Sequence, residues 1–229
     1  VITGCLRIAK ESIFSDINNI RVSTLLSKSY SNFFGFTEEE VEKLLADCGL
    51  SEHMEKIREW YNGYVFGGKV VYNPWSIMNY VANYEDGFVP YWINTSSNEL
   101  IKQLVLDYGV GLKYDMEKLL RDEPVEKEID ENIVFRDLGR HETDVWSLML
   151  FSGYLKAVEC RREGRRLMCN LLIPNEEVKW IFEKFFVEWL YEGVGSNEDV
   201  KNLIKAILSG DAETFEEILN RLMIRALSY

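Results

Sequence analysis

Residues 1–10 have the sequence VITGCLRIAK and continue into the more polar segment ESIFSDINNI, residues 11–20. A short apolar start that ends in Thr3-Gly4 predicts a buried strand that leads into a loop at one edge of a sheet. Such a strand needs neighbours, because its backbone N–H and C=O groups must be paired. Either residues 20–25 supply the partner, or the natural partner strands lie upstream of Val1. We favour the second interpretation.

Helix signals dominate the hundred residues that follow. Thr37 and Glu40 form a capping box, apolar positions at helical spacing come next, and Gly49 ends the helix. Ser96 and Glu99 form a second capping box and predict a helix to about residue 106.

One small hairpin interrupts these helices. The two-glycine turn at 67–68 separates the apolar segments 64–66 and 70–72, which predicts two short paired strands. Asn73-Pro74 then places a cap and an N1 proline at the start of another helix. This succession of helices with one small hairpin resembles the helical lid of an AAA-type ATPase.

The C-terminal part combines helices with a longer hairpin. Residues 142–152 predict a helix, and 154–158 and 167–173 predict two strands joined by a turn at 161–166. A helix followed by a hairpin, with helices around it, is compatible with a winged-helix module whose wing is the hairpin. Further helices are expected at 115–121, 176–191, 197–208 and 212–227.

Several stretches carry a resemblance to a known family. They are TG-x-x-R-x-x-K-E-S-I-F-x-x-x-N-N within 1–20, WYNGY at 60–64, YNPWS at 72–76, YWINTSSN at 91–98, and SGYL with IPNE within 148–177. In order and spacing, the chain resembles the predicted AAA-ATPase-like proteins of bacteria. The resemblance implies an upstream P-loop core in the same protein, ATPase activity with ATP and Mg²⁺ in the full-length protein, and often a downstream nuclease-like domain of the PD-(D/E)XK type.

The expected fold class is therefore mostly α with small β elements. The resemblance divides the chain into three parts: 1–35 as a remnant of the P-loop core, 36–110 as a helical lid, and 111–229 as a winged-helix-like and helical segment with a β-hairpin wing. The upstream core and the downstream nuclease-like domain are the partners that this division implies.

This chain by itself is not expected to hydrolyse ATP. The phosphate-binding pattern G-x-x-x-x-G-K-[ST] is absent from the sequence, and Gly67-Gly68-Lys69 lacks the first glycine and the final hydroxyl. We therefore expect no cofactor for the chain alone. The charged segment 125–128 lacks the hydrophobic strand context of a nuclease motif, so no nuclease activity is expected either.

Four residues are candidates for contact with a nucleotide. By resemblance, Thr3 holds the position of a catalytic polar residue that places the attacking water, and Arg7 and Lys10 lie on the exit loop, where a cation meets a phosphate. His141 matches a winged-helix histidine that senses nucleotide in some relatives of this ATPase class. The alternative is that Thr3 only ends a strand, that Arg7 and Lys10 are solvated, and that His141 is a surface or capping residue.

The asparagine-containing motifs have ordinary structural explanations. Asn62-Gly63 is typical of a turn, Asn73 of a helix cap, and Asn94 lies beside a capping box. The tryptophans of the same motifs are expected to anchor the core of the lid: Trp60, Trp75 and Trp92.

The tip of the predicted wing is rich in arginine. Arg161, Arg162, Arg165 and Arg166 lie within six residues, with only Glu163 to offset them. Because guanidinium groups match phosphate geometry, these residues are candidates for nucleic-acid backbone contact. The alternatives are a solubilising hairpin tip or docking onto an acidic face of the same protein.

Charge and cysteine content narrow the classes of function. The net charge of −12 argues against nucleic-acid binding over the whole surface. The four cysteines show no C-x-x-C pair and the two histidines are far apart, so we expect no metal site, no disulfide and a cytoplasmic location. No apolar run approaches the roughly 18 residues that a membrane helix needs, so no membrane partner is expected.

Two hypotheses follow for function. In the first, the chain is the lid and winged-helix-like part of an AAA-ATPase-like protein and closes over nucleotide bound by the upstream core. In the second, it is a non-catalytic module that binds protein or nucleic acid.

Overall fold

The computed structural model describes residues 22–92, 100–101, 104, 109–133, 141–184, 202, 205–206 and 209–227. Within these residues the chain is mostly helical with small antiparallel sheets, which confirms the expected fold class. The chain divides into two compact units, 1–181 and 182–229, and each is described by itself. The capping box at Ser96 and Glu99 lies outside the described residues.

The first helices form where the capping signals predict them. Helix α1, Glu38–Asp47, begins after Thr37, whose Oγ1 accepts a hydrogen bond from the Glu40 backbone N–H at 3.4 Å, while the Thr37 N–H donates to Glu40 Oε2 at 2.8 Å. A 3₁₀ turn, Ser51–His53, leads into α2, Met54–Tyr61. The capping box therefore fixes the N-terminus of α1 through local contacts alone.

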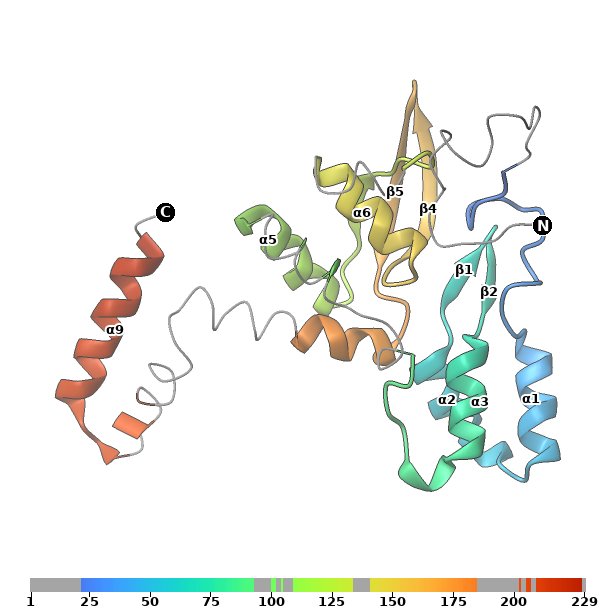
Figure 1. Cartoon of the computed structure of the whole chain (residues 1–229), viewed down its shortest axis with the longest axis horizontal. Helices are drawn as coiled ribbons and strands as arrows, with labels where there is room; N and C mark the ends of the chain where they lie inside the picture. Colours follow the sequence, from blue (N-terminus) through green and yellow to red (C-terminus); the bar gives the residue numbers. More distant parts are fainter. Residues whose placement is uncertain are drawn as a thin grey trace. The chain divides into compact units, whose positions relative to one another are not determined.

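Strands β1, Tyr64–Phe66, and β2, Lys69–Val71, form the predicted two-stranded hairpin, which Figure 1 shows beside α1–α3. Helix α3, Pro74–Ala82, starts with proline in its first turn, and the Oδ1 atom of Asn73 accepts a hydrogen bond from the Trp75 N–H at 3.0 Å. A 3₁₀ turn, Tyr84–Asp86, follows α3.

The core of this region is aromatic and aliphatic. Side chains from α1, α2 and α3 are nearly or completely buried against one another, among them Val41, Leu45, Ile57, Tyr61 and Ile77. Removing these side chains from water stabilises the three helices by about 25 cal/mol per Å² of apolar surface buried.

The second part of the first unit contains a three-stranded sheet. Helix α5, Gly109–Leu120, precedes strand β3, Val125–Glu128, and helix α6, Glu142–Phe151, precedes strands β4, Lys156–Glu163, and β5, Arg166–Leu172. The sheet order is β3-β5-β4 and both pairs are antiparallel, so β5 lies in the middle. Figure 1 shows β4 and β5 as a long hairpin next to α6. A further helix begins at residue 176 and is described to residue 184.

Helix α6 is buried on nearly every side. The consecutive residues from Asp144 to Leu150 are all buried, so the helix has no wide solvent face. Its sequence ETDVWSLMLF contains acidic residues and no lysine or arginine. This helix is built to support the fold and offers no basic surface.

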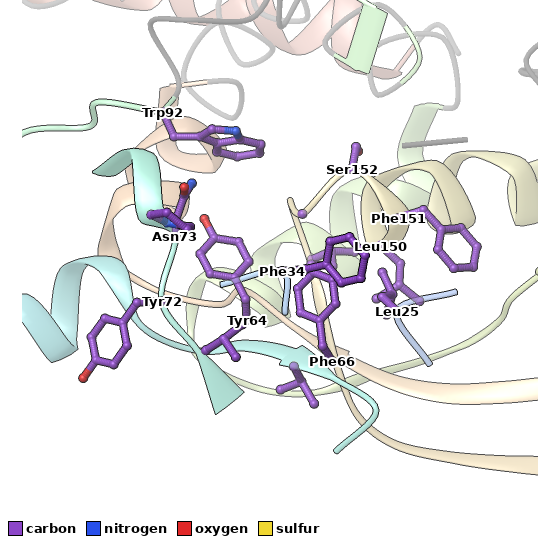
Figure 2. Close-up of a pocket in the computed structure, with 15 residues that line it drawn as sticks. Leu25, Phe34, Tyr64, Phe66, Tyr72, Asn73, Trp92, Leu150, Phe151 and Ser152 are labelled. Carbon is purple, nitrogen blue, oxygen red and sulfur yellow. The ribbon is translucent and has the colours of Figure 1, made fainter. Parts of the chain in front are cut away.

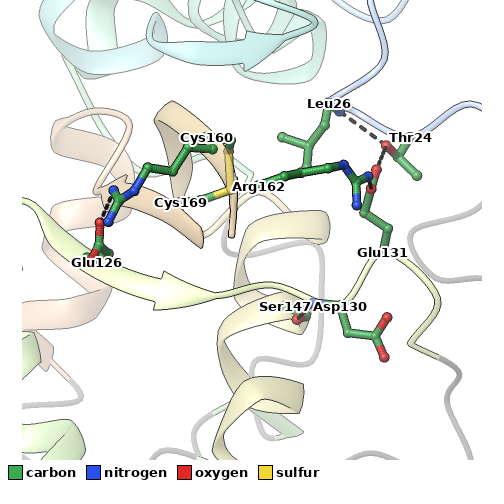
Figure 3. Close-up of a disulfide and its surroundings, with 10 residues drawn as sticks. Thr24, Leu26, Glu126, Asp130, Glu131, Ser147, Cys160, Arg162 and Cys169 are labelled. Carbon is green, nitrogen blue, oxygen red and sulfur yellow. Dashed lines mark hydrogen bonds and ion pairs between the residues drawn. A yellow bond between two sulfur atoms is a disulfide. The ribbon is translucent and has the colours of Figure 1, made fainter. Parts of the chain in front are cut away.

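The prediction that the cysteines form no disulfide is wrong for one pair. Cys160 on β4 and Cys169 on β5 are direct partners in the strand register and form a disulfide, with Cα atoms 4.1 Å apart. Figure 3 shows this bond joining β4 and β5. The absence of a C-x-x-C pattern hid the pairing, because a hairpin brings together residues nine positions apart.

The described part of the second unit includes helix α9, Ala212–Leu227, which was expected from its spacing. Asp211 precedes it, and its Oδ1 atom accepts a hydrogen bond from the Thr214 N–H at 3.1 Å. Among the described residues, no helix is both long enough and apolar enough to span a bilayer.

Candidate functional site

The two halves of the first unit meet at a buried glutamate. The N-terminal half is 22–92 and the C-terminal half is 109–181. Glu177 of the C-terminal half is fully buried, and its Oε2 atom accepts a hydrogen bond from Ser76 Oγ of α3 at 2.8 Å. Its Oε1 atom accepts one from the Trp92 backbone N–H at 2.7 Å. One carboxylate therefore binds two separate segments of the N-terminal half.

A second tie lies beside the first. Asn175 donates from Nδ2 to the Asn62 carbonyl oxygen at 2.7 Å, and its Oδ1 atom accepts a hydrogen bond from the Val178 N–H at 3.1 Å. The same side chain thus caps the helix that carries Glu177 and holds the turn after α2. Asn175 is therefore a helix cap, and its contact with Asn62 adds a tertiary role to a local one.

Gly63 allows the two halves to approach closely. A Cβ atom at this position would lie 2.1 Å from the Pro174 carbonyl oxygen, and the residue has φ of +95°. Only glycine adopts this φ without strain and leaves room for the neighbouring backbone. The Asn62-Gly63 turn therefore serves the junction as well as the local change of direction.

Burial changes the proton affinity of this junction. Burial raises the pKa of Glu177 to about 7, although the hydrogen bonds that the carboxylate accepts oppose the shift. Burial also raises the pKa of Tyr64 and lowers the pKa of Lys156, whose Nζ atom donates to the Pro174 carbonyl oxygen at 3.3 Å. None of the ion pairs found among the described residues includes Glu177. The junction is therefore a buried polar cluster around an acid that is held by neutral donors.

Most of the predicted wing arginines are bound to glutamates. Arg161 contacts Glu126 of β3 and donates from Nε to Glu163 Oε1 at 2.9 Å. Arg162 Nη2 lies 3.0 Å from Glu131 Oε2, a pair that Figure 3 shows beside the disulfide. These contacts favour the alternative in which the wing docks onto an acidic face of its own protein.

Arg166 also faces an acid. Its Nε atom lies 3.6 Å from Glu128 Oε2. Arg165 lines a cavity of about 360 Å³ together with Arg162 and His141. The structure thus brings three sequence-predicted residues to one cavity, and Arg161 and Arg166 are not among its lining residues.

His141 occupies a capping position. It is the residue before α6, and its backbone N–H donates to Asp144 Oδ2 at 2.9 Å. Asp130, Glu131 and Asp144 line the same cavity as His141, so acidic groups offset its arginines. This environment agrees with the alternative of a capping histidine, and the nucleotide contact remains a prediction.

The other predicted site residues have mixed outcomes. Thr3, Arg7 and Lys10 lie outside the described residues, so their roles remain predictions. Trp75 was expected in the core but is 53% exposed, in the first turn of α3. Trp92 does pack inward, and its ring centre lies 5.2 Å from that of Tyr154. In the described part of the chain, no three His, Cys, Asp or Glu side chains are grouped to hold a metal ion.

Sequence reasoning missed Glu177 and its contacts with Ser76 and Trp92. The only local signal was position: Glu177 lies in the first turn of the helix that begins at residue 176, where an acid is favourable. That local explanation gave no reason to expect a contact across 101 residues of sequence.

Comparison with known proteins finds sequence similarity to another protein but no family. No family profile matches the chain, and no solved structure matches it. It is similar to a protein described as "Uncharacterized protein in vnfD 5'region" from Azotobacter chroococcum mcd 1, with 26% identity over 212 residues. The match covers 92% of this chain and 39% of that relative, so the chain spans about two-fifths of the relative's length.

Proposed function

We propose that this chain is the lid and winged-helix-like part of an AAA-ATPase-like protein. In this proposal a P-loop core upstream of Val1 binds ATP and Mg²⁺, the helices α1–α3 close over the nucleotide, and the C-terminal half moves with them. The movement reaches a nuclease-like domain downstream. The whole protein then acts as a nucleotide-driven switch.

The order of elements in the C-terminal half supports the winged-helix part of the proposal. The proposal rests on a helix followed by a hairpin, with further elements around them. Here α5 and β3 precede α6 and the β4–β5 hairpin, and β3 pairs with β5. The buried acidic helix α6 favours a role in protein contact for this module over reading of a DNA groove.

The observation that carries the proposal is the junction. Glu177 and Asn175 of the C-terminal half bind Ser76, Trp92 and Asn62, all within or beside the motifs that carry the family resemblance. One of these hydrogen bonds is buried and the other two are partly buried, so a lid that moves takes the winged-helix-like half with it. A rigid coupling of this kind is what a relay of nucleotide state requires.

The first test concerns nucleotide. In a polypeptide that includes the region upstream of Val1, we expect Thr3→Ala and Arg7→Ala each to lower ATP turnover about tenfold or more, because they remove a polar group or a charge beside the phosphates. The measurements are ATP affinity and steady-state turnover, and Arg121→Ala, on a surface turn after α5, is the control. Unchanged affinity and turnover in both variants would favour the alternative of a non-catalytic binding module.

The second test concerns the coupling. Ser76→Ala removes one of the buried hydrogen bonds to Glu177. In the same long polypeptide we expect ATP affinity to stay within about twofold, while the nucleotide-dependent protection of the C-terminal half from proteolysis is lost. Equal protection in Ser76→Ala and the unsubstituted protein would argue against the coupling.

A further inference from the structure

A second cavity, distinct from the one beside His141, lies within the first unit. Its volume is about 200 Å³, and hairpin β1–β2, the C-terminal end of α6 and the loop that precedes α1 form its walls. Figure 2 shows the rings of Phe34 and Phe66 close together and beside Leu150. None of the residues that line it carries a charge. The cavity therefore suits an uncharged guest.

Polar groups gather at one end of this cavity. Tyr64 is only 8% exposed, and its hydroxyl makes no hydrogen bond of ordinary geometry within the described residues, although the side-chain amides of Asn73 and Asn175 lie near enough to act on its pKa. Figure 2 shows that hydroxyl directed toward the Asn73 amide, below the ring of Trp92. The Oδ1 atom of Asn73 already accepts from the Trp75 N–H, so its Nδ2 group remains as a donor on this side.

An unpartnered buried hydroxyl is unfavourable, at a cost of about 1–3 kcal/mol, unless a guest completes its hydrogen bonds. Water would find polar partners at the Tyr64 end only, because the opposite end is formed by Leu25, Phe34 and Phe66. An amphipathic guest satisfies both ends at once. The lining thus specifies a flat apolar body with one hydrogen-bonding group.

The volume limits the size of the guest. An apolar protein cavity of about 150 Å³ binds benzene, and drug-sized ligands occupy about 300–1,000 Å³. A cavity of about 200 Å³ lies just above the first value. It fits one aromatic ring with one small substituent.

We propose that this cavity is a binding site for a neutral single-ring aromatic ligand whose hydroxyl or carbonyl group bonds to Tyr64. The rings of Phe34 and Phe66, 6.4 Å apart at their centres, contact the apolar body of the ligand. Trp92 covers the polar end, where its ring meets that of Tyr64 edge to face at 6.5 Å. This site is independent of any nucleotide and of the upstream core.

The probes are p-cresol, toluene and benzoate, each titrated into the isolated 229-residue chain and followed by changes in its ¹H–¹⁵N NMR spectrum. Each probe has one aromatic ring. p-Cresol carries a hydroxyl, toluene carries no polar group, and benzoate carries a negative charge. We expect p-cresol to bind with shifts at Tyr64, Phe66 and Gly153, toluene to bind about fivefold more weakly for lack of one hydrogen bond, and benzoate at least tenfold more weakly.

The decisive variant is Tyr64→Phe, which keeps the ring and removes the hydroxyl. We expect it to abolish the preference for p-cresol over toluene while toluene affinity stays within about twofold. Tyr114→Phe, at a tyrosine that is 61% exposed, is the matched control and should change neither affinity.

Two results would overturn the proposal. One is a p-cresol preference that survives in Tyr64→Phe, and the other is benzoate binding as tightly as p-cresol. A phenol ring can come from a free molecule or from a tyrosine of another protein, and N-acetyltyrosinamide separates these sources. If N-acetyltyrosinamide binds as tightly as p-cresol, the natural ligand is a tyrosine of another protein. If N-acetyltyrosinamide does not bind, the natural ligand is a free small molecule.

Discussion

Single residues at the junction make contacts that the neighbouring sequence does not predict. Glu177 is an acid without a cation among the described residues, held by one hydroxyl and backbone N–H groups. Removing a carboxylate from water is costly, and neutral donors offset only part of that cost. The residue therefore makes the stability of the first unit sensitive to pH.

The sign of that dependence follows from the pKa of Glu177, which rises from its ordinary value of 4.5 to about 7 in the folded protein. The folded state holds the proton more tightly than the unfolded state. The resulting stabilisation is fully present below about pH 4.5 and is lost as pH rises through about 7. We expect the loss to be at most about 3 kcal/mol.

Glu177→Gln tests this expectation. It keeps the shape and one acceptor and removes the titration, so the fall in the free energy of unfolding between about pH 5 and 8 should become smaller. Urea denaturation at both pH values measures it. Glu42→Gln, at an exposed position of α1, is the control and should leave the pH dependence unchanged. An identical pH dependence in Glu177→Gln and the unsubstituted chain would contradict the assignment.

Gly63 and Gly68 provide a matched pair of substitutions. Both have positive φ, +95° and +84°, but an added Cβ would meet the Pro174 carbonyl oxygen at Gly63 and nothing within 4 Å at Gly68. We expect Gly68→Ala to lower the free energy of unfolding by about 1 kcal/mol because of its positive φ alone. We expect Gly63→Ala to lower it by at least about 2 kcal/mol more because of the clash. Urea unfolding midpoints measure both. Equal losses would show that the halves do not meet at Gly63.

At the scale of elements, local signals predicted local structure. The Thr37–Glu40 capping box, the glycine turn of the first hairpin and Asn73-Pro74 each involve residues a few positions apart, and each forms as expected. The contacts from Glu177 to Trp92 and from Asn175 to Asn62 span 85 and 113 residues. No periodicity or cap encodes such distances, so the candidate site at the junction was not predictable from one sequence.

The wing hairpin shows the same limit. Its two strands were predicted, but the ion pairs of its arginines depend on the residues that a third strand places beside them. Strand β3 pairs with β5 and brings Glu126 and Glu128 to the hairpin's arginines. The disulfide depends on a register in which Cys160 and Cys169 face each other.

The disulfide should stabilise the β4–β5 hairpin without being needed to form it. Seven residue pairs, of which Cys160 and Cys169 are one, already join β4 to β5. For a loop of this length, chain entropy predicts a contribution of about 2–3 kcal/mol. We expect the double substitution Cys160→Ser with Cys169→Ser to lower the free energy of unfolding by that amount while the hairpin amides stay protected from hydrogen exchange.

Cys48→Ser is the control for this prediction, because Cys48 is a free and exposed cysteine. A reductant should lower the stability of the unsubstituted chain and of Cys48→Ser equally, and leave the double variant unaffected. Insensitivity of the unsubstituted chain to reductant would show that the bond contributes nothing.

At the scale of the whole molecule, charge decides which partners are favoured. The sequence carries a net charge of −12, and the arginine cluster looks like a local reversal of sign. In three dimensions Glu126, Glu128, Glu131 and Glu163 face arginines of the wing. The four glutamates thus pair with three of the four arginines, and little positive charge remains for a phosphate backbone.

Nucleic-acid contact through the wing therefore has a quantitative expectation. Each neutralised phosphate adds about 0.9 to the slope of log affinity against log salt, so four free arginines would give a slope near 4. We expect a slope below about 2 for duplex DNA, measured by fluorescence anisotropy between about 50 and 200 mM salt. Arg165→Gln should lower this slope by about 1, because none of the ion pairs found among the described residues includes Arg165. Arg161→Gln should leave the slope unchanged, because two glutamates already pair with Arg161. A slope near 4 with equal losses for both variants would mean that DNA displaces the glutamates, and the wing would then be a nucleic-acid contact after all.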